Sequence, residues 1–272
     1  MEPVVQQIAQ RLKNQFYGKY RGFVVDNQDP EKRGRLKLRI PTVLGEQDTG
    51  WALPCLPFGG LADQGLFMVP EVDAQVWVEF EEGNLDHPIW VGVFWQQESD
   101  TPSEAALDEP TTRLLKTPSG HVLQFDDKDG EEQFRLAHPA GSEMIIDANG
   151  SISLEDASSA KVTLDAESNK IVVQDSNGNV LTMDSSGTVI EDSNGNKIEM
   201  AAAGVTVKGT QIVIDGSQVH VGGTGGEPLI KGTTFLSMFN SHTHNCTAPG
   251  APSGPPLPPL TPAVLTTATK AK

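Results

Sequence analysis

The chain has 272 residues, of which 37% are hydrophobic and 6% aromatic. This apolar content is too low to fill one large compact core, so we expect a thin or elongated body. The 36 acidic residues outnumber the 20 basic ones and give a formal net charge of -16, which disfavours binding to nucleic acid and to anionic lipid.

Cys55 and Cys246 form no spacing pattern, so neither a disulfide framework nor a cysteine zinc site is expected. No apolar run approaches the roughly 20 residues of a membrane helix, and no signal-peptide core is visible. We therefore expect synthesis in the cytoplasm without a signal peptide.

Residues 1–18 are predicted to contain a short helix. Its apolar residues recur at intervals of three and four and form one stripe, made of Val4, Val5, Ile8, Leu12 and Phe16. The stripe needs a surface to pack against. That surface is either the chain's own neighbouring domain or a partner, and the sequence leaves both open.

In residues 19–96 the apolar residues recur with a period of two. The segments YRGFVVDN, GRLKLRIP, AQVWVEFEEG and IWVGVFW are typical of short strands, and clusters such as NQDPEKRG are typical of turns. About five strands without a convincing helix between them predict a small barrel of the OB-fold type. The basic residues of KRGRLKLR alternate with apolar ones on one strand, which favours a solvated strand face over a nucleic-acid groove.

Residues 97–118 are polar, acidic and punctuated by proline, which predicts a linker.

Residues 119–232 repeat a short unit of apolar alternation, an Asp and a turn with Gly or Asn. The segments DSNGNVLTMDSSGTVI (175–190) and DSNGNKIEMAAAGVTV (192–207) align at a spacing of 17. Asn-Gly favours positive φ and so reverses the chain without strain. Each strand offers only two or three inward apolar residues, such as Leu181 with Met183, and repetition is needed to bury them.

Two assemblies fit these repeats. In the first, three chains intertwine as a triple-stranded β-helical needle, and their strand edges pair with neighbouring chains. In the second, one chain forms a β-solenoid that binds or degrades a surface polysaccharide. The repeat length drifts from 19 through 17 to about 7 residues, and this drift favours the trimer.

At this point the sequence resembles a known family. The run KTPSGHVLQFDDKDGEEQFRLAHPAGSEMIIDANGSISL (116–154) is similar to the junction of barrel and needle in VgrG proteins of type VI secretion. The barrel segments resemble the OB domain of phage baseplate assembly protein V and of contractile-tail spikes. The run FLSMFNSHTHNCTAPGAPSGPPLPPL is similar to C-termini of phage-type spikes.

The resemblance implies an all-β homotrimeric spike with an OB collar and a needle, which punctures a target envelope when a sheath contracts. It also implies partners, namely a separate hub protein at the collar, baseplate subunits and a PAAR-type tip protein at the needle end. VgrG proteins carry a large hub domain before the barrel, and this sequence has only the helical stretch there. The linker is too short for the lysozyme that some phage spikes insert.

Residues 233–272 contain Ser-His-Thr-His-Asn and a proline-rich tail, in which seven of the fourteen residues 249–262 are proline. On an extended strand, His242 and His244 face the same side. Two histidines from each of three chains would supply six nitrogens, which suits octahedral iron(II), and similar spikes hold an apical iron with a His-x-His motif. The alternative interpretation is a polar turn before a flexible tail.

No enzyme motif is present, and we expect no catalytic residues. The acidic residues of the repeats lie mainly at turn positions, where Asp bonds to the local backbone; examples are Asp147, Asp165, Asp184 and Asp192. His87, His121, His138 and His220 are dispersed, and His121 is expected to be a structural residue at the start of the needle.

Overall fold

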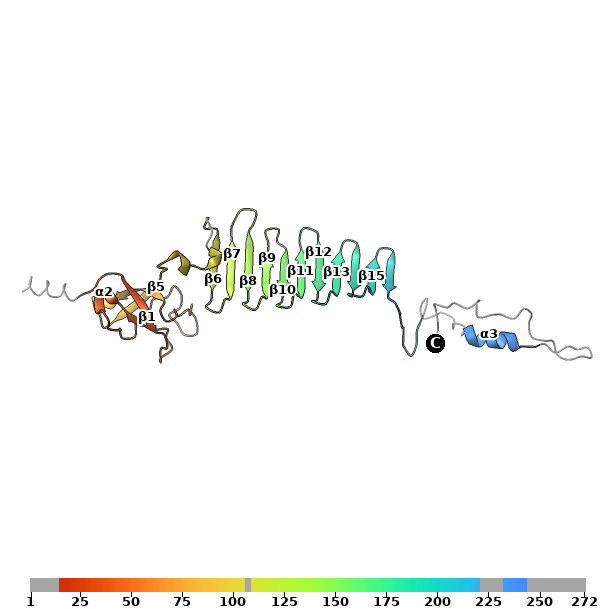
Figure 1. Ribbon diagram of the computed structural model, residues 1–272, viewed down its shortest axis with the longest axis horizontal. Coiled ribbons are helices and arrows are strands. Elements are labelled where there is room, and N and C mark those ends of the chain that lie inside the picture. The colour runs from red at the N-terminus through yellow and green to blue at the C-terminus, as the bar shows by residue number, and fades with distance from the viewer. Residues whose placement is uncertain (1–14, 106–108, 221–231, 244–272) are drawn as a thin grey trace, which may run out of the picture. The chain divides into compact units, whose positions relative to one another are not determined.

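The computed structural model describes residues 15–105, 109–220 and 232–243 (Figure 1). Most of the predicted N-terminal helix and the whole proline-rich run at 249–262 lie outside these ranges. The chain divides into a first unit that ends at Val207 and a second that begins at Lys208.

The first described domain is a five-stranded barrel with strand order β2-β1-β4-β5-β3. Its pairs are antiparallel except for β3 with β5, which is parallel. A bridge between Leu36 and Ala52 joins the two ends of this order and closes the barrel. This Greek-key closure is that of an OB fold. The strands are β1 (Tyr20–Asp26), β2 (Lys37–Arg39), β3 (Leu53–Pro54), β4 (Gln75–Phe80) and β5 (Pro88–Val93), with helix α2 (Pro41–Leu44) after β2 and a 3-10 turn η1 (Glu81–Gly83) after β4.

Period-two alternation builds the barrel core. In β4 the residues Val76, Val78 and Phe80 are buried, and the residues between them are less so. The indole N–H of Trp90 donates to the Gly34 carbonyl at 3.1 Å, which satisfies the one polar group of this large buried ring. The core therefore consists of the inward residues that the alternation predicts.

The segment after the barrel is more ordered than a linker. It contains two 3-10 turns, η2 (Glu98–Asp100) and η3 (Ser103–Ala105). The Asp100 carboxylate accepts the backbone N–H groups of Gln96 and Gln97, and Lys116 donates to both carboxylate oxygens of Glu104 at 2.8 Å. The first strand of the following sheet begins at Thr112, so part of the range 97–118 belongs to the sheet.

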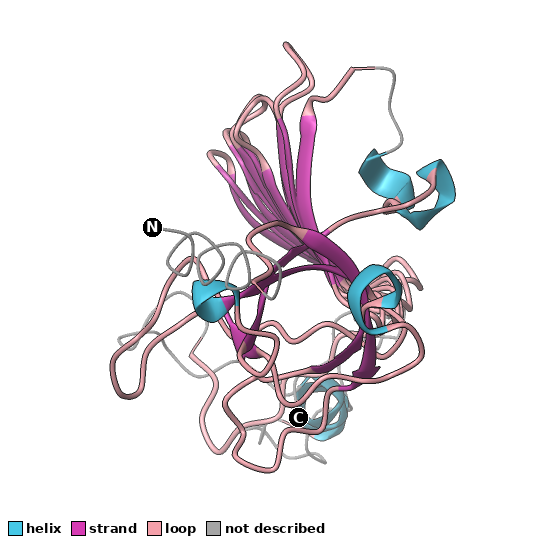
Figure 2. Cartoon of the chain, turned by 90° about the vertical axis from the view of Figure 1, so that its left-hand side faces the viewer, coloured by secondary structure: helices cyan, strands magenta, loops and turns pink. Residues whose placement is uncertain are grey.

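The second domain is one antiparallel sheet of eleven strands in strict chain order (Figure 1). In Figure 2 its strands lie one behind another in a single layer. The strands are β6 (Thr112–Lys116), β7 (Val122–Asp126), β8 (Gln133–Ala137), β9 (Glu143–Ile146), β10 (Ile152–Glu155), β11 (Lys161–Asp165), β12 (Lys170–Gln174), β13 (Val180–Asp184), β14 (Gly187–Glu191), β15 (Lys197–Ala201) and β16 (Gly204–Lys208).

This meander confirms an all-β architecture and differs from the single-chain solenoid in its strand pairing. A single-chain solenoid advances by coils that stack in the same direction, whereas this chain reverses at every strand. The strands between 112 and 208 also find their hydrogen-bonding neighbours within their own chain. Within the single chain, neighbouring strands of residues 112–208 thus satisfy one another's backbone groups.

The repeated segment DSNGN forms a turn that is stabilised by hydrogen bonds to its first residue, Asp. Asp175 Oδ1 accepts the backbone N–H groups of Asn177 and Asn179, both at 2.9 Å, and Gly178 takes a φ of 86°. Asp192 does the same with Asn194 and Asn196. The predicted turn role of these acids is confirmed, because each carboxylate satisfies backbone donors that the tight turn leaves unpaired.

Beyond Lys208 the expected continuation of short strands is not seen, because residues 209–220 form no strand. A helix, α3 (Gly232–Ser241), follows. Among the described residues, no helix is both long enough and apolar enough to cross a lipid bilayer.

Candidate functional site: the apolar face of the sheet

One face of the sheet carries two continuous rows of side chains, because residues that pair across antiparallel strands share a face. The first row is Leu115, Leu123, Leu136, Met144, Leu154, Val162, Val173, Leu181, Ile190 and Ile198. The second row is Arg113, Phe125, Phe134, Ile146, Ile152, Leu164, Ile171, Met183, Thr188 and Met200. We call these rows together the two-row face.

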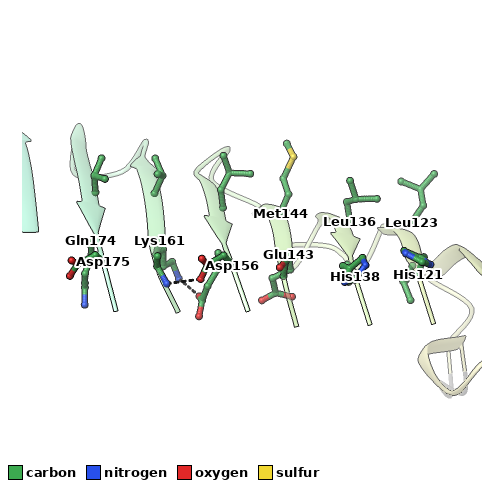
Figure 3. A pocket seen from close by; sticks show the side chains of 18 of the residues that line it. His121, Leu123, Leu136, His138, Glu143, Met144, Asp156, Lys161, Gln174 and Asp175 are labelled. Atoms are coloured by element: carbon green, nitrogen blue, oxygen red, sulfur yellow. Dashed lines mark hydrogen bonds and ion pairs between the residues drawn. The ribbon is translucent and has the colours of Figure 1, made fainter. Parts of the chain in front are cut away.

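The two-row face is open in the single chain. Leu136 is 50% exposed and Leu154 is 47% exposed, although both are large and apolar. The first row lines a groove of about 830 Å³ that runs from β6 to β12. Figure 3 shows Leu123, Leu136 and Met144 on adjacent strands of this groove. A continuous exposed apolar surface of this length marks an interaction site.

The opposite face of the sheet is largely polar. Its neighbouring strands are joined by ion pairs such as Arg135 with Glu143 at 3.1 Å and Lys161 with Glu155 at 3.4 Å. These pairs are partly exposed, so each contributes little stability. The two faces of the sheet therefore differ in polarity.

His121 and His138 lie side by side at one end of the first row, with ring centroids 4.8 Å apart (Figure 3). His138 Nδ1 accepts the backbone N–H of Ala140 at 3.1 Å, and His121 Nδ1 lies 2.9 Å from Ser119 Oγ. A metal-binding imidazole normally donates its second N–H, whereas His138 uses Nδ1 as an acceptor. His138 therefore fits a structural role at the start of the sheet.

The carboxylates of the turns are held in their charged form. The backbone N–H and the side-chain amide of Asn179 lower the pKa of Asp175 to about 2. Hydrogen bonds from Ser158 and Asn196 lower the pKa of Asp156 and Asp192. A general acid needs a raised pKa, so these residues are unsuited to that role.

Several basic residues of the barrel are paired with carboxylates. Arg35 donates to Asp29 at 2.6 Å in a buried pair that lowers the pKa of Asp29, chiefly through this hydrogen bond. Lys37 lies 3.5 Å from Asp26, and Arg39 lies 3.2 Å from Asp48. This arrangement supports a solvated strand face, because cations engaged with carboxylates are poorly placed to bind phosphates.

Of the two residues predicted to bind metal, the structure describes His242. His242 follows α3, and its backbone N–H donates to Met238 at 3.1 Å, so it continues the helical bonding and does not lie on an extended strand. Its Nδ1 lies against the Phe239 carbonyl. His244 lies outside the described residues. Within the described ranges, no cluster of three or more metal-ligating side chains occurs.

Sequence reasoning found the inward pairs of individual strands, such as Leu181 with Met183. It missed Leu115 and the rest of β6, because proline and acidic residues nearby resemble a linker. It also missed that His138 replaces the turn Asp; the signal was the spacing of His-Pro-Ala-Gly-Ser, which matches Asp-Ala-Asn-Gly-Ser at 147–151.

Comparisons with known proteins match the barrel to a family model and a short segment to one curated protein. Residues 20–95 match the type VI secretion system/phage-baseplate injector OB domain. A 41-residue segment is 39% identical to the pre-baseplate central spike protein Gp5 of Enterobacteria phage T4, covering 15% of this chain and 7% of that protein. The matched part is thus a small share of that relative's length.

A solved structure also matches, the SAS-4 (dCPAP) TCP domain in complex with a proline-rich motif of Ana2 (dSTIL) of Drosophila melanogaster. It is 11% identical and covers 56% of this chain and 99% of that chain, at a TM-score of 0.25. A score this low carries no argument about the fold. The barrel of residues 20–95 thus matches the injector OB domain of type VI secretion systems and phage baseplates, and a short segment of the chain is similar to a phage pre-baseplate central spike protein.

Proposed function

We propose that the protein is the homotrimeric central spike of a contractile injection device. The observation that carries this proposal is the two-row face, in which 18 of 20 side chains are apolar and no second layer of the described chain covers them. Three such faces packed around a common axis bury one another and leave the three polar faces outside.

The needle would work by stiffness. In each sheet the hydrogen bonds run from strand to strand in chain order, so a break across the trimer must open one ladder in each of its three sheets together. Residues 120–232 hold 18 acidic and 7 basic residues. Such a surface does not partition into lipid unaided, so passage through the target envelope is forced by sheath contraction.

The OB collar would seat the spike in the baseplate, against a separate hub protein and surrounding baseplate subunits. The match of residues 20–95 to an injector OB domain supports this placement. A PAAR-type tip protein or a cargo would bind beyond the needle, with the proline-rich tail as the attachment segment.

Iron at the trimer apex is proposed for His242 and His244. The contact of His242 Nδ1 with the Phe239 carbonyl fits this chemistry, because a backbone carbonyl commonly orients an imidazole that binds metal through Nε2. The bound ion would tie the three chains together at the apex. Elemental analysis should find iron in the purified protein, and replacement of both histidines by Ala should remove it; a metal-free protein would reject the site.

Light scattering of the purified protein tests the trimer. We expect a particle with three times the 29.1 kDa mass of one chain. A stable, folded particle of one chain would reject the spike, because its two-row face would then remain in water.

A further inference from the structure

Three turns of the sheet contain the dipeptide Asn-Gly with the Gly at positive φ. They are Asn149-Gly150, Asn177-Gly178 and Asn194-Gly195, and the three Asn residues are exposed. Glycine has no side chain to shield its backbone nitrogen, which makes the Asn side-chain amide before it accessible to attack. The three turns thus repeat one reactive group in nearly the same setting.

We propose that Asn177 is the preferred site of spontaneous deamidation in this protein. The Gly178 backbone nitrogen loses its proton and forms a bond to Asn177 Cγ, and the Cγ–Nδ2 bond breaks with release of ammonia. Water then opens the resulting succinimide at either carbonyl. Opening at one carbonyl gives Asp, and opening at the other gives isoaspartate, whose backbone contains one additional methylene group.

The preference for Asn177 follows from the hydrogen bond of the attacking nitrogen. The N–H of Gly150 donates to Asp147 at 2.9 Å, and that of Gly195 donates to Asp192 at 3.0 Å. The N–H of Gly178 donates to Asp175 over 3.4 Å, beyond the usual range for a bond of this type. Because a bonded N–H must be freed before it can react, Gly178 is the least protected of the three.

The reaction at Asn177 would also disturb the contacts of its own turn. Its closing bond joins the N–H of Asp175 to the carbonyl of Asn179 at 3.0 Å, and Asn179 Oδ1 accepts the N–H of Ser193 in the next turn along the same edge. An added methylene between residues 177 and 178 lengthens the loop and shifts both contacts. The modification therefore loosens the β12–β13 and β14–β15 turns together.

Mass spectrometry of the full-length protein tests this ranking. The folded protein is held in mildly alkaline buffer prepared with oxygen-18 water, and samples are digested at intervals. Tandem spectra assign the label to each Asn-Gly pair. We expect Asn177 to lose its amide several-fold faster than Asn149 and Asn194, and we expect this difference to disappear in urea, where the three turns are unfolded.

Two variants serve as controls. Asn177→Ser should abolish the fast reaction and keep the turn, since Ser158 holds the equivalent place after Asp156 and donates its N–H at 2.8 Å. Gly178→Ser should slow the reaction without unfolding the turn, since Ser159 tolerates a φ of 69° at the matching position. Equal rates at the three sites in the folded protein, or faster loss at Asn149 or Asn194, would overturn the proposal.

Discussion

His138 and Asp156 hold equivalent positions in two turns at the same edge of the sheet. His138 Nδ1 accepts the N–H of the residue two places on at 3.1 Å, and Asp156 Oδ1 does the same at 2.8 Å. An imidazole nitrogen thus replaces a carboxylate oxygen as the turn acceptor. This requires His138 to be neutral with its proton on Nε2.

That equivalence predicts the effect of substitution at this turn. His138→Asp should leave the melting temperature close to that of the parent protein, because the new carboxylate can accept the same N–H. His138→Ala should destabilise by about 0.5–1.5 kcal/mol, the usual net worth of one hydrogen bond. Thermal denaturation followed by circular dichroism measures both. Equal losses in the two variants would contradict the acceptor role.

The two-row face predicts which substitutions break the assembly. Leu136→Asp places a charge on the apolar face and should dissociate the proposed trimer, since burial of one Leu contributes about 1.5–3 kcal/mol per chain and is lost three times. Gln124→Asp on the opposite face is the matched control and should leave the assembly intact. Size-exclusion chromatography with light scattering reports the mass. A Leu136→Asp protein of unchanged mass would count against the packing of this face.

The turn carboxylates predict a loss of stability in acid. Hydrogen bonds in the folded protein lower the pKa of Asp175 from 3.8 to about 2, and those of Asp156, Asp165 and Asp192 are also lowered. Their contribution is therefore complete above the unfolded pKa near 3.8 and declines as the pH falls toward 2. Thermal melts across this range should show a falling midpoint.

Asp175→Asn isolates one member of that set. The Asn side chain still offers an oxygen to the turn but does not titrate, so the dependence of the midpoint on pH should become shallower. A steeper dependence of the melting midpoint on pH in Asp175→Asn would exclude the turn carboxylates as the source of the acid sensitivity. An unchanged dependence in a variant that lacks several of these carboxylates would exclude them as well.

Truncation of a side chain in the barrel core should destabilise the barrel strongly, whereas truncation of an exposed side chain should not. Leu38 is fully buried, and Leu38→Ala should destabilise the barrel by about 2–5 kcal/mol. Leu61 is 75% exposed, and Leu61→Ala should change stability by less than about 0.5 kcal/mol. Trp51, Trp77, Trp90 and Trp95 all belong to residues 20–95, so tryptophan fluorescence during urea unfolding reports this domain alone.

Much of the architecture was predictable because its signals are local. The alternation in QVWVEF puts Val76 and Val78 on one apolar face of the strand, and this is the face that the barrel buries. The Asp of DSNGN accepts hydrogen bonds from the backbone N–H groups two and four residues further on, so its role can be predicted from this five-residue segment alone. The apolar pairs of each sheet strand were equally visible, because period two fixes which side chains share a face.

The sequence by itself therefore determined the two β domains, the turns and the existence of an apolar face. Only the tertiary structure decided that the strands of residues 112–208 pair within one chain and in chain order. The alternation of apolar residues is the same in a meander, a solenoid and an intertwined needle. It determines which side chains share a face, but it does not determine which strand pairs with which. The partner of each strand is set by contacts that no short stretch of sequence contains.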